Sequence, residues 1–531
     1  MTHPYVVEDW SADERQILER YFTNTERPVF ALKNLPEVVK GALFARYSRS
    51  SKSLRRLFLD EFYKGEDGGG VADIGSERAA DLYDRIFIEF GDDSVAQLGG
   101  AHIAVEQGSN ILTKVLEWGR LAAYLEQSTR YVPYDDKPGG RYRYYLEPQL
   151  VQALGPAYAE SMEAIFELYS QALPKAVEGL RKRFPQTPND PDRVYNATTR
   201  AKALDALRGM LPASTVSNTG IYATGQAYES MLLRMRASSL HEVRSVAEMM
   251  LEELNQVMDV FLQRVDQPNR GGVWSRYLAE TQESISKVTS SLTEDMDPEP
   301  SPRVELIDWD TDAEEKLVAA MLYASSNLSE SQLRSRVAAM SSEERIRVVE
   351  SYVGDRRNRR HKPGRAFERI NYRFDVLADY GAFRDLQRHR MLTLEWQDLS
   401  ALHSYEMSED IEQLGLSGSY EEAMEISADL WGRVAKELPK QAQYCVCMAY
   451  RIRFVMQMNA REAMHLIELR SSPQGHPSYR VVAHDMHRLI EQVAGHKAVA
   501  RAMSFVDFSD VDLERLEAER DAERKRQSRK T

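Results

Sequence analysis

The chain has 531 residues, of which 43% are apolar and 28% are charged, and its formal net charge is −13. This length favours more than one domain. The negative charge argues against a nucleic-acid coat or a membrane-surface protein, since both present a basic face to phosphates. The only cysteines, Cys445 and Cys447, lie too close together in the sequence to pair, so we expect no disulfide framework.

The two ends of the chain carry no targeting or membrane signal. The N-terminus, MTHPYVVEDWSADERQ, lacks a basic start followed by an apolar run, and nowhere do about 18 apolar residues follow one another. We therefore expect a cytoplasmic protein without a membrane-spanning helix. Charged residues dominate 511–531, which predicts a solvated tail.

Apolar residues recur at helical spacing over long segments, most clearly over 150–184 and 419–454, so helix dominates the prediction. Two shorter segments, 101–107 and 370–380, show partial alternation with β-branched or aromatic residues. Each predicts a strand that runs directly into a helix. A strand-then-helix unit is thus expected twice, and the fold class is α+β.

Prolines, serines and acidic residues at 291–305 predict a linker between two halves. The halves resemble diverged copies, because three pairs of similar segments occur in the same order. The pairs begin at Ala45 and Leu322, at Leu116 and Leu386, and at Leu232 and Leu466. We predict domains at 1–290 and 306–510, with a helical insertion in the first at about 147–195.

An Arg-His-Arg triplet stands at Arg388, His389 and Arg390, and the first half has LEQSTRY at 125–131. Together they resemble the signature of the flavin-dependent thymidylate synthases, the ThyX family, written R-H-R-x-x-S-x-N-E-x-S-x-R-Y. The first half keeps the end of the signature, at Glu126, Ser128 and Arg130. The second half keeps its beginning and has Trp396, Asp398 and Ser400 in the later positions.

A later family segment divides in the same way. In the family, an arginine shortly before Leu-Pro precedes a helix with the pattern N-x-R-x-x-x-[NH]-x-x-x-x-R. The first half keeps the arginines, at Arg208 and Arg236. The second half keeps Asn459, Arg461, His465 and Arg470, and has Gln443 at the earlier arginine position. The losses in the two halves are therefore complementary.

The resemblance implies a division of labour. It assigns a uracil nucleotide to Glu126, Ser128, Arg130, Arg208 and Arg236, with Arg236 as the catalytic residue. It assigns FAD to a second set, which comprises Arg388, His389, Arg390, Asn459, Arg461 and His465. The residue types agree with this assignment, because guanidinium and hydroxyl groups bind a phosphate, and a dinucleotide needs cations with amide or imidazole partners.

The resemblance further implies reductive methylation of dUMP to dTMP with FAD, methylenetetrahydrofolate and NAD(P)H. It implies two tandem ThyX-like domains, each with a mainly antiparallel sheet covered by helices, a composite site between the halves, and a homodimer of the fused chain. The family's histidine beside the folate corresponds to Asp92 or Pro363, and its glutamine before R-H-R to Val115 or Asp385. These departures leave open another pyrimidine nucleotide or one-carbon donor, or a non-catalytic nucleotide-binding scaffold.

Two other features have competing interpretations. The basic segment 355–365 could bind nucleic acid, but in an acidic chain a solvated surface or a pocket rim is the favoured interpretation. The two cysteines with His484 and His487 lack the spacing of a zinc site, so we predict no metal.

Overall fold

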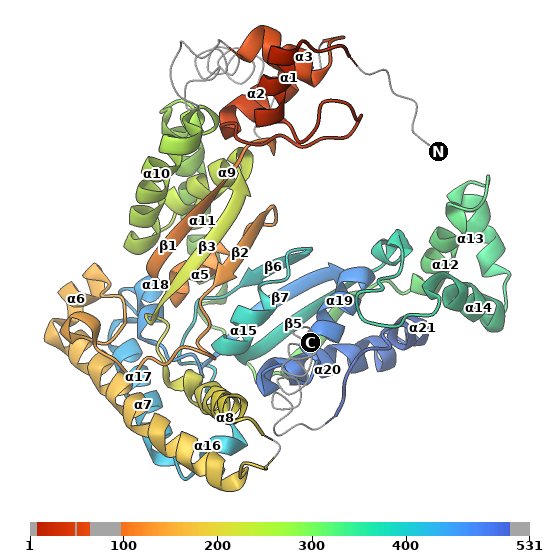
Figure 1. The fold of residues 1–531 in the computed structure, drawn as a ribbon. Coiled ribbons are helices and arrows are strands. Elements are labelled where there is room, and N and C mark those ends of the chain that lie inside the picture. The colour runs from red at the N-terminus through yellow and green to blue at the C-terminus, as the bar shows by residue number, and fades with distance from the viewer. Residues whose placement is uncertain (1–7, 48–49, 64–96, 189, 510–531) are drawn as a thin grey trace. The chain divides into compact units, whose positions relative to one another are not determined.

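The computed structural model describes residues 8–47, 50–63, 97–188 and 190–509 (Figure 1). The predicted tail at 511–531 and most of the segment around Asp92 lie outside the described residues. The chain forms two compact units. Unit 1 comprises Met1–Glu106, Leu121–Glu126 and Asn218–Met296, and unit 2 comprises Gln107–Arg120, Gln127–Ser217 and Asp297–Thr531. The compact units therefore do not coincide with the two sequence halves. Most of residues 107–217, which belong to the first half of the sequence, lie in the same unit as the second half.

Unit 1 is built around a three-stranded sheet with the order β1-β3-β2. Strands β2 and β3 are antiparallel, in a register that pairs Ala122 with Ala223 and Glu126 with Thr219. Its helices and strands are α1 (Ala12–Tyr21), α2 (Glu37–Tyr47), α3 (Leu54–Leu57), η1 (Phe58–Phe62), β1 (Gly100–Ser109), β2 (Ala122–Glu126), β3 (Val216–Thr224), α9 (Gly225–Arg236), α10 (His241–Asp266) and α11 (Gly271–Thr293), with the last residues of β1 and the first of β3 assigned to unit 2.

Unit 2 contains a four-stranded sheet with the order β4-β5-β7-β6, and its strands pair antiparallel. Its elements before the sheet are α5 (Asn110–Leu116), η6 (Pro138–Gly140), α6 (Pro148–Leu154), α7 (Pro156–Arg183), α8 (Asp192–Leu207) and η7 (Arg208–Met210). The remainder are β4 (Val304–Trp309), α12 (Ala313–Tyr323), α13 (Glu330–Ala338), α14 (Ser342–Val353), η8 (Arg365–Arg369), β5 (Asn371–Asp379), α15 (Tyr380–Leu386), β6 (Leu392–Trp396), α16 (Glu409–Gln413), α17 (Ser417–Val434), α18 (Pro439–Ala442), η9 (Gln443–Cys445), β7 (Arg451–Asn459), α19 (Ala460–Arg470), α20 (Pro477–Gln492) and α21 (Lys497–Ala502).

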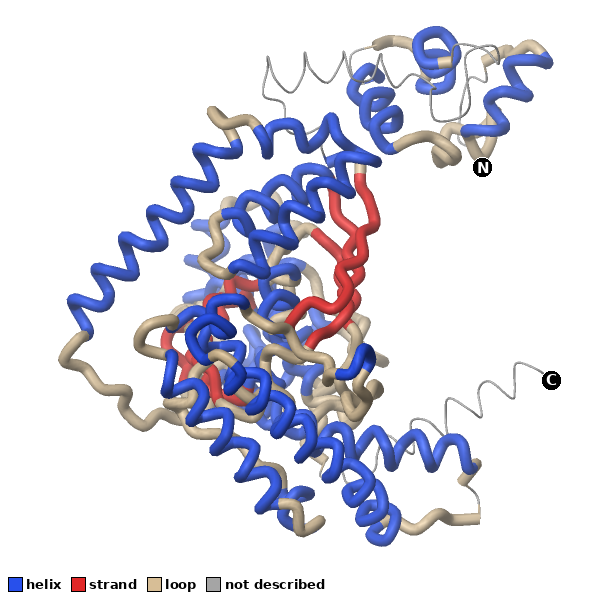
Figure 2. The backbone as a smooth tube through the Cα atoms, turned by 90° about the vertical axis from the view of Figure 1, so that its left-hand side faces the viewer, coloured by secondary structure: helices blue, strands red, loops and turns tan. Residues whose placement is uncertain are grey.

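The predicted fold class is confirmed: helices make up most of the chain, and the strands form two antiparallel sheets (Figure 2). The strands predicted at 101–107 and 370–380 are confirmed as β1 and β5. The helix predicted over 419–454 is confirmed to Val434 but is wrong at its end, where β7 begins at Arg451. There Ile452, Phe454 and Met456 alternate with less buried residues, which is the period of a half-buried strand.

The internal repeat is visible in the order of the elements. Each repeat has strand, helix and strand, and later a 3₁₀ turn, strand and helix, so that β1-β3-β2 matches β5-β7-β6. Equivalent side chains cap equivalent helices. Ser109 and Asp379 accept the N-terminal backbone bonds of α5 and α15, and Thr224 and Asn459 do so for α9 and α19.

Within unit 2, equivalent residues of the two repeats meet each other. Pro212 pairs with Cys447 in an antiparallel bridge, and these residues stand at the same position relative to η7 and η9. The Tyr380 hydroxyl donates to the carbonyl of Asn110, 2.9 Å away, and these two residues begin α15 and α5. Contact between the same residues of two copies is the mark of a twofold axis. The junction of the repeats is therefore pseudo-twofold.

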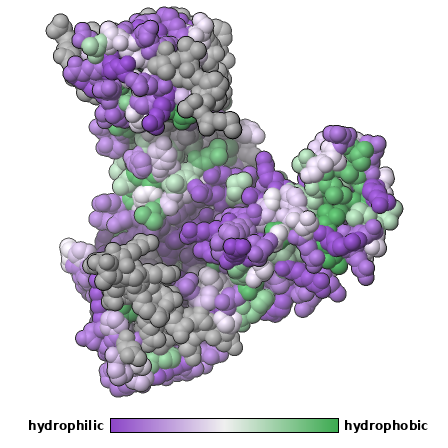
Figure 3. Space-filling model, turned by 45° about the vertical axis from the view of Figure 1, so that its right-hand side comes forward, coloured by the Kyte–Doolittle hydropathy of each residue, from purple (hydrophilic) through white to green (hydrophobic). Residues whose placement is uncertain are grey.

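Helices α12, α13 and α14 form a group in which apolar side chains reach the surface (Figure 3). Tyr323 and Leu328 are exposed there. None of the described helices combines the length and the apolar character needed to cross a membrane.

Candidate functional site

The Arg-His-Arg triplet lies between α15 and β6, and its three side chains differ in exposure. Arg388 and Arg390 are exposed, whereas His389 is buried. Nδ1 of His389 lies 2.9 Å from Oε1 of Glu462, and Arg470 donates from Nε to Nε2 of His389 over 3.0 Å. Because Arg470 can only donate, Nε2 is the acceptor and Nδ1 carries the proton. Burial lowers the pKa of His389 to about 4, so the ring is neutral at pH 7.

Glu462 connects two histidines. Its second oxygen lies 3.4 Å from Nδ1 of His465, which is partly exposed. Burial opposes ionisation of Glu462, but the hydrogen bonds with the two histidines outweigh it and lower its pKa to about 2. The side-chain nitrogen and oxygen atoms of His389, Glu462 and His465 lie within 4.8 Å of one another, as the ligands of a metal ion do. Arg470, however, donates to the same histidine, so these residues form a hydrogen-bonded chain that ends in a cation.

Asp385, in α15, is surrounded by arginines from both repeats. Arg208 of the first repeat lies 3.3 Å from its carboxylate, and Arg388 of the second lies 3.9 Å away. Burial opposes ionisation of Asp385, but Arg208, Arg388, Arg470 and Arg130 hold its pKa well below the usual value. We call Asp385 and these four arginines the arginine cluster. Four guanidinium groups from the two repeats thus gather around one carboxylate, and one of them, Arg130, also pairs with Asp205.

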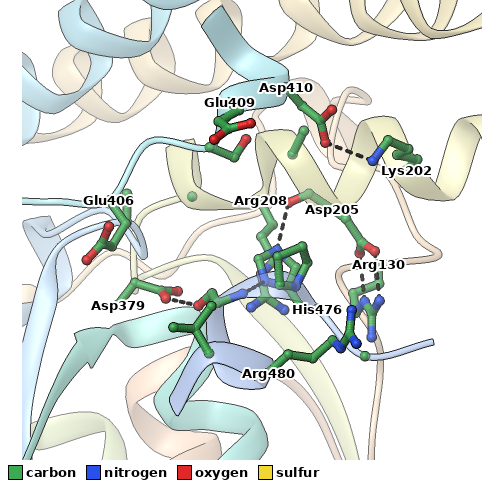
Figure 4. Close-up of a pocket in the computed structure, with 18 of the residues that line it drawn as sticks. Arg130, Lys202, Asp205, Arg208, Asp379, Glu406, Glu409, Asp410, His476 and Arg480 are labelled. Atoms are coloured by element: carbon green, nitrogen blue, oxygen red, sulfur yellow. Dashed lines mark hydrogen bonds and ion pairs between the residues drawn. The ribbon is translucent and has the colours of Figure 1, made fainter. Parts of the chain in front are cut away.

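Arg208 joins the arginine cluster to a cavity of about 410 Å³ in unit 2 (Figure 4). The side chain is 5% exposed, and its Nη2 is buried without a hydrogen-bond partner among the described residues. A Cβ at Gly381 would lie 3.0 Å from Nε and Nη2 of Arg208, so only glycine lets the guanidinium lie against the start of α15. A buried guanidinium with an unused donor is a ready binding group for an anion in the cavity.

Arg130 and Ser128 are held by local contacts beside the same cavity. Arg130 forms a bidentate pair with Asp205, with both distances 2.7 Å, and Nη1 donates to the hydroxyl of Tyr479 over 3.3 Å. The hydroxyl of Ser128 accepts from the backbone nitrogen of Arg130 over 3.2 Å. Arg130 is therefore already neutralised, whereas Arg208 retains a donor.

His476 forms another wall of the cavity. Its Nδ1 accepts from the backbone nitrogen of Ser478 over 3.2 Å, so Nε2 is the donor to the carbonyl of Asp205, also 3.2 Å away. Burial, reinforced by Arg208, lowers the pKa of His476 to about 3. Asp379 accepts a short hydrogen bond from Ser478, and burial raises its pKa against the effect of Arg208. The walls thus include several polar side chains that are fixed by hydrogen bonds.

The other predicted residues divide into two groups. Arg461 and His465 are partly exposed on α19, near Glu462, and Asn459 caps the same helix. Glu126 and Arg236 lie in unit 1, where Arg236 pairs with Glu248 and Asp266 at 2.6 and 2.7 Å. Within unit 2, the structure brings Arg130 and Arg208 together with Arg470, the repeat counterpart of Arg236. The catalytic role of Arg236 stays a prediction.

Pseudo-symmetry predicts a second site, but its charged residues are replaced. The first residues of η7 and η9 are Arg208 and Gln443, and the positions four residues before β2 and β6 hold Trp118 and Arg388. Trp118 packs edge-on against Trp396 with 6.1 Å between the ring centres, and Gln443 donates to Asp398 over 3.2 Å. Asp398 also pairs with Lys440 at 2.8 Å. The second location is thus occupied by an aromatic contact and a local ion pair.

The basic segment 355–365 lies against α19. Arg356 is buried in a bidentate pair with Glu468, at 2.7 and 2.6 Å, and Arg461 donates to the carbonyl of Pro363 over 2.9 Å. Arg357 and Arg365 are exposed. The segment thus contacts Arg461, one of the residues predicted to bind FAD, and keeps Arg357 and Arg365 at the surface.

A neutral buried His389 makes stability depend on pH. The ordinary pKa of 6.5 applies to the unfolded chain and about 4 to the folded one, so below pH 6.5 the unfolded state takes up the proton first. The stabilisation is complete above pH 6.5 and is lost as the pH falls toward 4. Between pH 7 and 5, urea unfolding should show that wild type loses about 2 kcal/mol more than His389→Gln. Equal losses would contradict the neutral assignment.

The fold and the site together define a doubled α+β protein in which arginines of both repeats gather around Asp385 where the repeats meet. The chain belongs to the thymidylate synthase complementing protein family, which matches residues 41–259 and 305–495. It is 38% identical to a UPF0159 protein of Chlamydia muridarum over 520 residues, covering 96% of this chain and 98% of that protein. For a UPF0159 protein of Chlamydia pneumoniae the identity is 39% over 521 residues, with the same coverage.

A UPF0159 protein of Thermoplasma acidophilum is 33% identical over 514 residues, which cover 90% of this chain and 97% of that protein. Since these relatives match over nearly their whole length, they share the doubled length. The family matches confirm the resemblance on which the site residues were predicted. Asp385, Glu462 and His476 were not among those residues. Glu462 could have been found from its spacing, because Asn459, Glu462 and His465 recur at every third position along one side of α19.

Proposed function

We propose that this protein is a flavin-dependent thymidylate synthase that methylates dUMP to dTMP with methylenetetrahydrofolate and NAD(P)H, using one composite site per chain. The observation that carries this proposal is the arginine cluster. Arg130 and Arg208 come from the first repeat, and Arg388 and Arg470 from the second, and they surround one carboxylate next to a cavity. The complementary losses in the sequence are what such a site would produce.

The nucleotide would bind through its phosphate at Arg208. The buried Nη2 donor of Arg208, within a cluster of four arginines, favours a dianion over a neutral ligand. Arg130, fixed by Asp205 and Tyr479, would orient the nucleotide by its charge, and Ser128 would supply a hydroxyl. These residues position the substrate and stabilise charge on its carbonyl oxygens.

The flavin would bind at the exposed side of the second repeat. Arg388, Arg390 and Arg461 offer cations for a pyrophosphate, and His465 offers an imidazole, so the residues present fit a dinucleotide. His389 and Asn459 use their side-chain groups inside the protein and would position Glu462, Arg470 and α19. When bound, reduced FAD supplies the hydride that converts the transferred one-carbon unit to a methyl group.

One residue favours a second candidate within the same chemistry. Asp385 stands where the resembling family has a glutamine, and it places a carboxylate inside the cluster. A flavoenzyme acting on another pyrimidine nucleotide, or with another one-carbon donor, would also account for it. Complementation of a thymidine-requiring strain distinguishes dTMP synthesis from action on another nucleotide, because only dTMP synthesis restores growth. An assay with dUMP and methylenetetrahydrofolate as the sole one-carbon source tests the donor.

Separate titrations of FAD and dUMP test the composite site. Arg390→Gln with Arg461→Gln should weaken FAD binding at least about 10-fold, because two cations near the pyrophosphate are lost. It should leave dUMP binding within about threefold, since neither residue belongs to the arginine cluster. Ser128→Ala with Arg130→Ala should do the reverse. If either double variant lost both FAD and dUMP binding while still folded, the assignment of the two ligands to separate sets of residues would be wrong.

A further inference from the structure

Helix α11 (Gly271–Thr293) presents an apolar stripe to solvent. Seven of the twenty-five large apolar side chains that are exposed in the described part of the chain lie on this helix or within three residues of its end. They are Val273, Trp274, Tyr277, Ile285, Val288, Leu292 and Met296. Such a concentration on one element marks an interaction surface.

The stripe follows the spacing of a coiled coil. Trp274, Leu278, Thr281, Ile285, Val288 and Leu292 follow one another at intervals of four, three, four, three and four residues. This period of 3.5 keeps one seam facing another helix along the whole length. A membrane surface or a globular groove requires a wide apolar face and imposes no such period.

The exposed part of α11 cannot be stable alone. The first turns contact unit 1, where Ser275 donates to the carbonyl of Leu233 over 3.2 Å and Gly271 lies too close to Val265 for any side chain. From Thr281 to Thr293 every residue is exposed. Nine of these thirteen residues are serine, threonine, valine or isoleucine, which are poor helix formers. An uncovered segment of this length and composition would unwind in water.

We propose that α11 pairs antiparallel with α11 of a second copy of this chain, about a twofold axis at the level of Glu283. This register places Trp274 against Leu292 of the other copy, Leu278 against Val288, and Thr281 against Ile285. Every residue of the seam then has a partner from the same seam, as a closed twofold interface requires. A different protein would need an apolar seam of the same spacing and length, which a second copy of α11 already has.

Charge distribution on α11 is compatible with self-pairing. The positions that flank the seam are uncharged: they are Ser275, Tyr277, Gln282, Ser284, Thr289 and Ser291. The charged residues Arg276, Glu280, Glu283 and Lys287 lie on the outer side of the helix. In coiled coils, like charges at the flanking positions repel an unsuitable partner helix. Two copies of α11 have no such charges there and can approach each other without this repulsion.

Sedimentation velocity of the full chain tests the pairing. Wild type should be a dimer at micromolar concentration, and Ile285→Ser with Val288→Ser and Leu292→Ser should weaken it at least about 100-fold. The control Glu280→Ser with Glu283→Ser and Lys287→Ser changes the outer side of the same helix and should stay within about threefold. A monomeric wild type, or a seam variant that remains as dimeric as the control, would overturn the proposal.

Cysteine cross-linking tests the direction. Cys445 and Cys447 are fully buried, so an added surface thiol is the reactive one. Thiol oxidation of mixed Thr281→Cys and Ile285→Cys proteins should give the heterodimer in large excess over either homodimer. Dominant Thr281→Cys homodimers would overturn the antiparallel register. The proposal does not rest on the proposed function, and the seam variant should bind FAD and dUMP as wild type does if that function is correct.

Discussion

Replacing Arg208 by glutamine is expected to raise the dissociation constant for dUMP at least about 100-fold, as measured by calorimetry. Losing one partner of a buried charge-assisted contact costs about 3 kcal/mol, which corresponds to that factor. Arg208 is the buried cluster member whose Nη2 has no partner within the described residues. Arg208→Gln therefore removes the donor proposed to bind the phosphate of dUMP.

The matched control is Arg303→Gln. Arg303 lines the same cavity, but its side chain is 41% exposed and pairs with Asp485, so dUMP binding should change less than about threefold. A second variant separates the phosphate contact from repulsion by Asp385. If Arg208→Gln with Asp385→Asn regained wild-type affinity, Arg208 would serve only to neutralise the carboxylate, and the proposed contact would be wrong.

Replacing Glu468 by glutamine is expected to lower the free energy of unfolding by about 3–5 kcal/mol. Glu468 and Arg356 are 2% and 3% exposed and share two hydrogen bonds, so the variant leaves a buried guanidinium without its counter-charge. Arg356 also fixes the segment 355–365 through the carbonyls of His361 and Ala502. Urea unfolding at pH 7 measures the loss.

A surface pair provides the comparison for Glu468. Asp308 pairs with Arg373 at 2.6 Å, but the two side chains are 57% and 42% exposed, so Asp308→Asn should cost less than about 1 kcal/mol. Arg356→Met with Glu468→Leu removes both charges and should be less damaging than Glu468→Gln alone. A loss of less than about 1 kcal/mol for Glu468→Gln would contradict the importance of this buried pair.

The pseudo-twofold junction explains why the two repeats lost different residues. Two equivalent locations exist across the axis, and each takes residues from both repeats. At one location Arg208 meets Asp385 and Arg388, and at the other the corresponding residues are Gln443, Val115 and Trp118. Replacing a binding residue at the second location would not weaken binding at the first. Complementary degeneration is therefore what one retained site predicts.

Much of the fold followed from local patterns. Strands β1 and β5 and the long helix α7 have clear periodicity, and the repeat was visible from three ordered pairs of segments. Strand β7 was not predicted, because Arg451, Ile452, Arg453 and Phe454 follow an apolar stretch that helical spacing also fits. Its status as a strand depends on pairing with β5, from Asn371–Asn459 to Asp379–Arg451, which local periodicity does not reveal.

The sequence indicated the residue types of the candidate site, but not the contacts among them. The resemblance placed Arg208 and Arg236 in one set, and the structure adds that Arg470, the counterpart of Arg236, donates to His389. In the sequence, Asp385 is only a departure from the glutamine that the family has before R-H-R. Only the folded structure shows four arginines around it.

The central claim is that one composite site per chain binds both ligands, and titration of dUMP into the FAD-loaded protein tests it most directly. The flavin absorbance should change on adding nucleotide and saturate at one dUMP and one FAD per chain, because only one of the two pseudo-equivalent locations keeps its charged residues. Two equivalent nucleotides per chain, or a folded protein that binds neither ligand, would contradict the account.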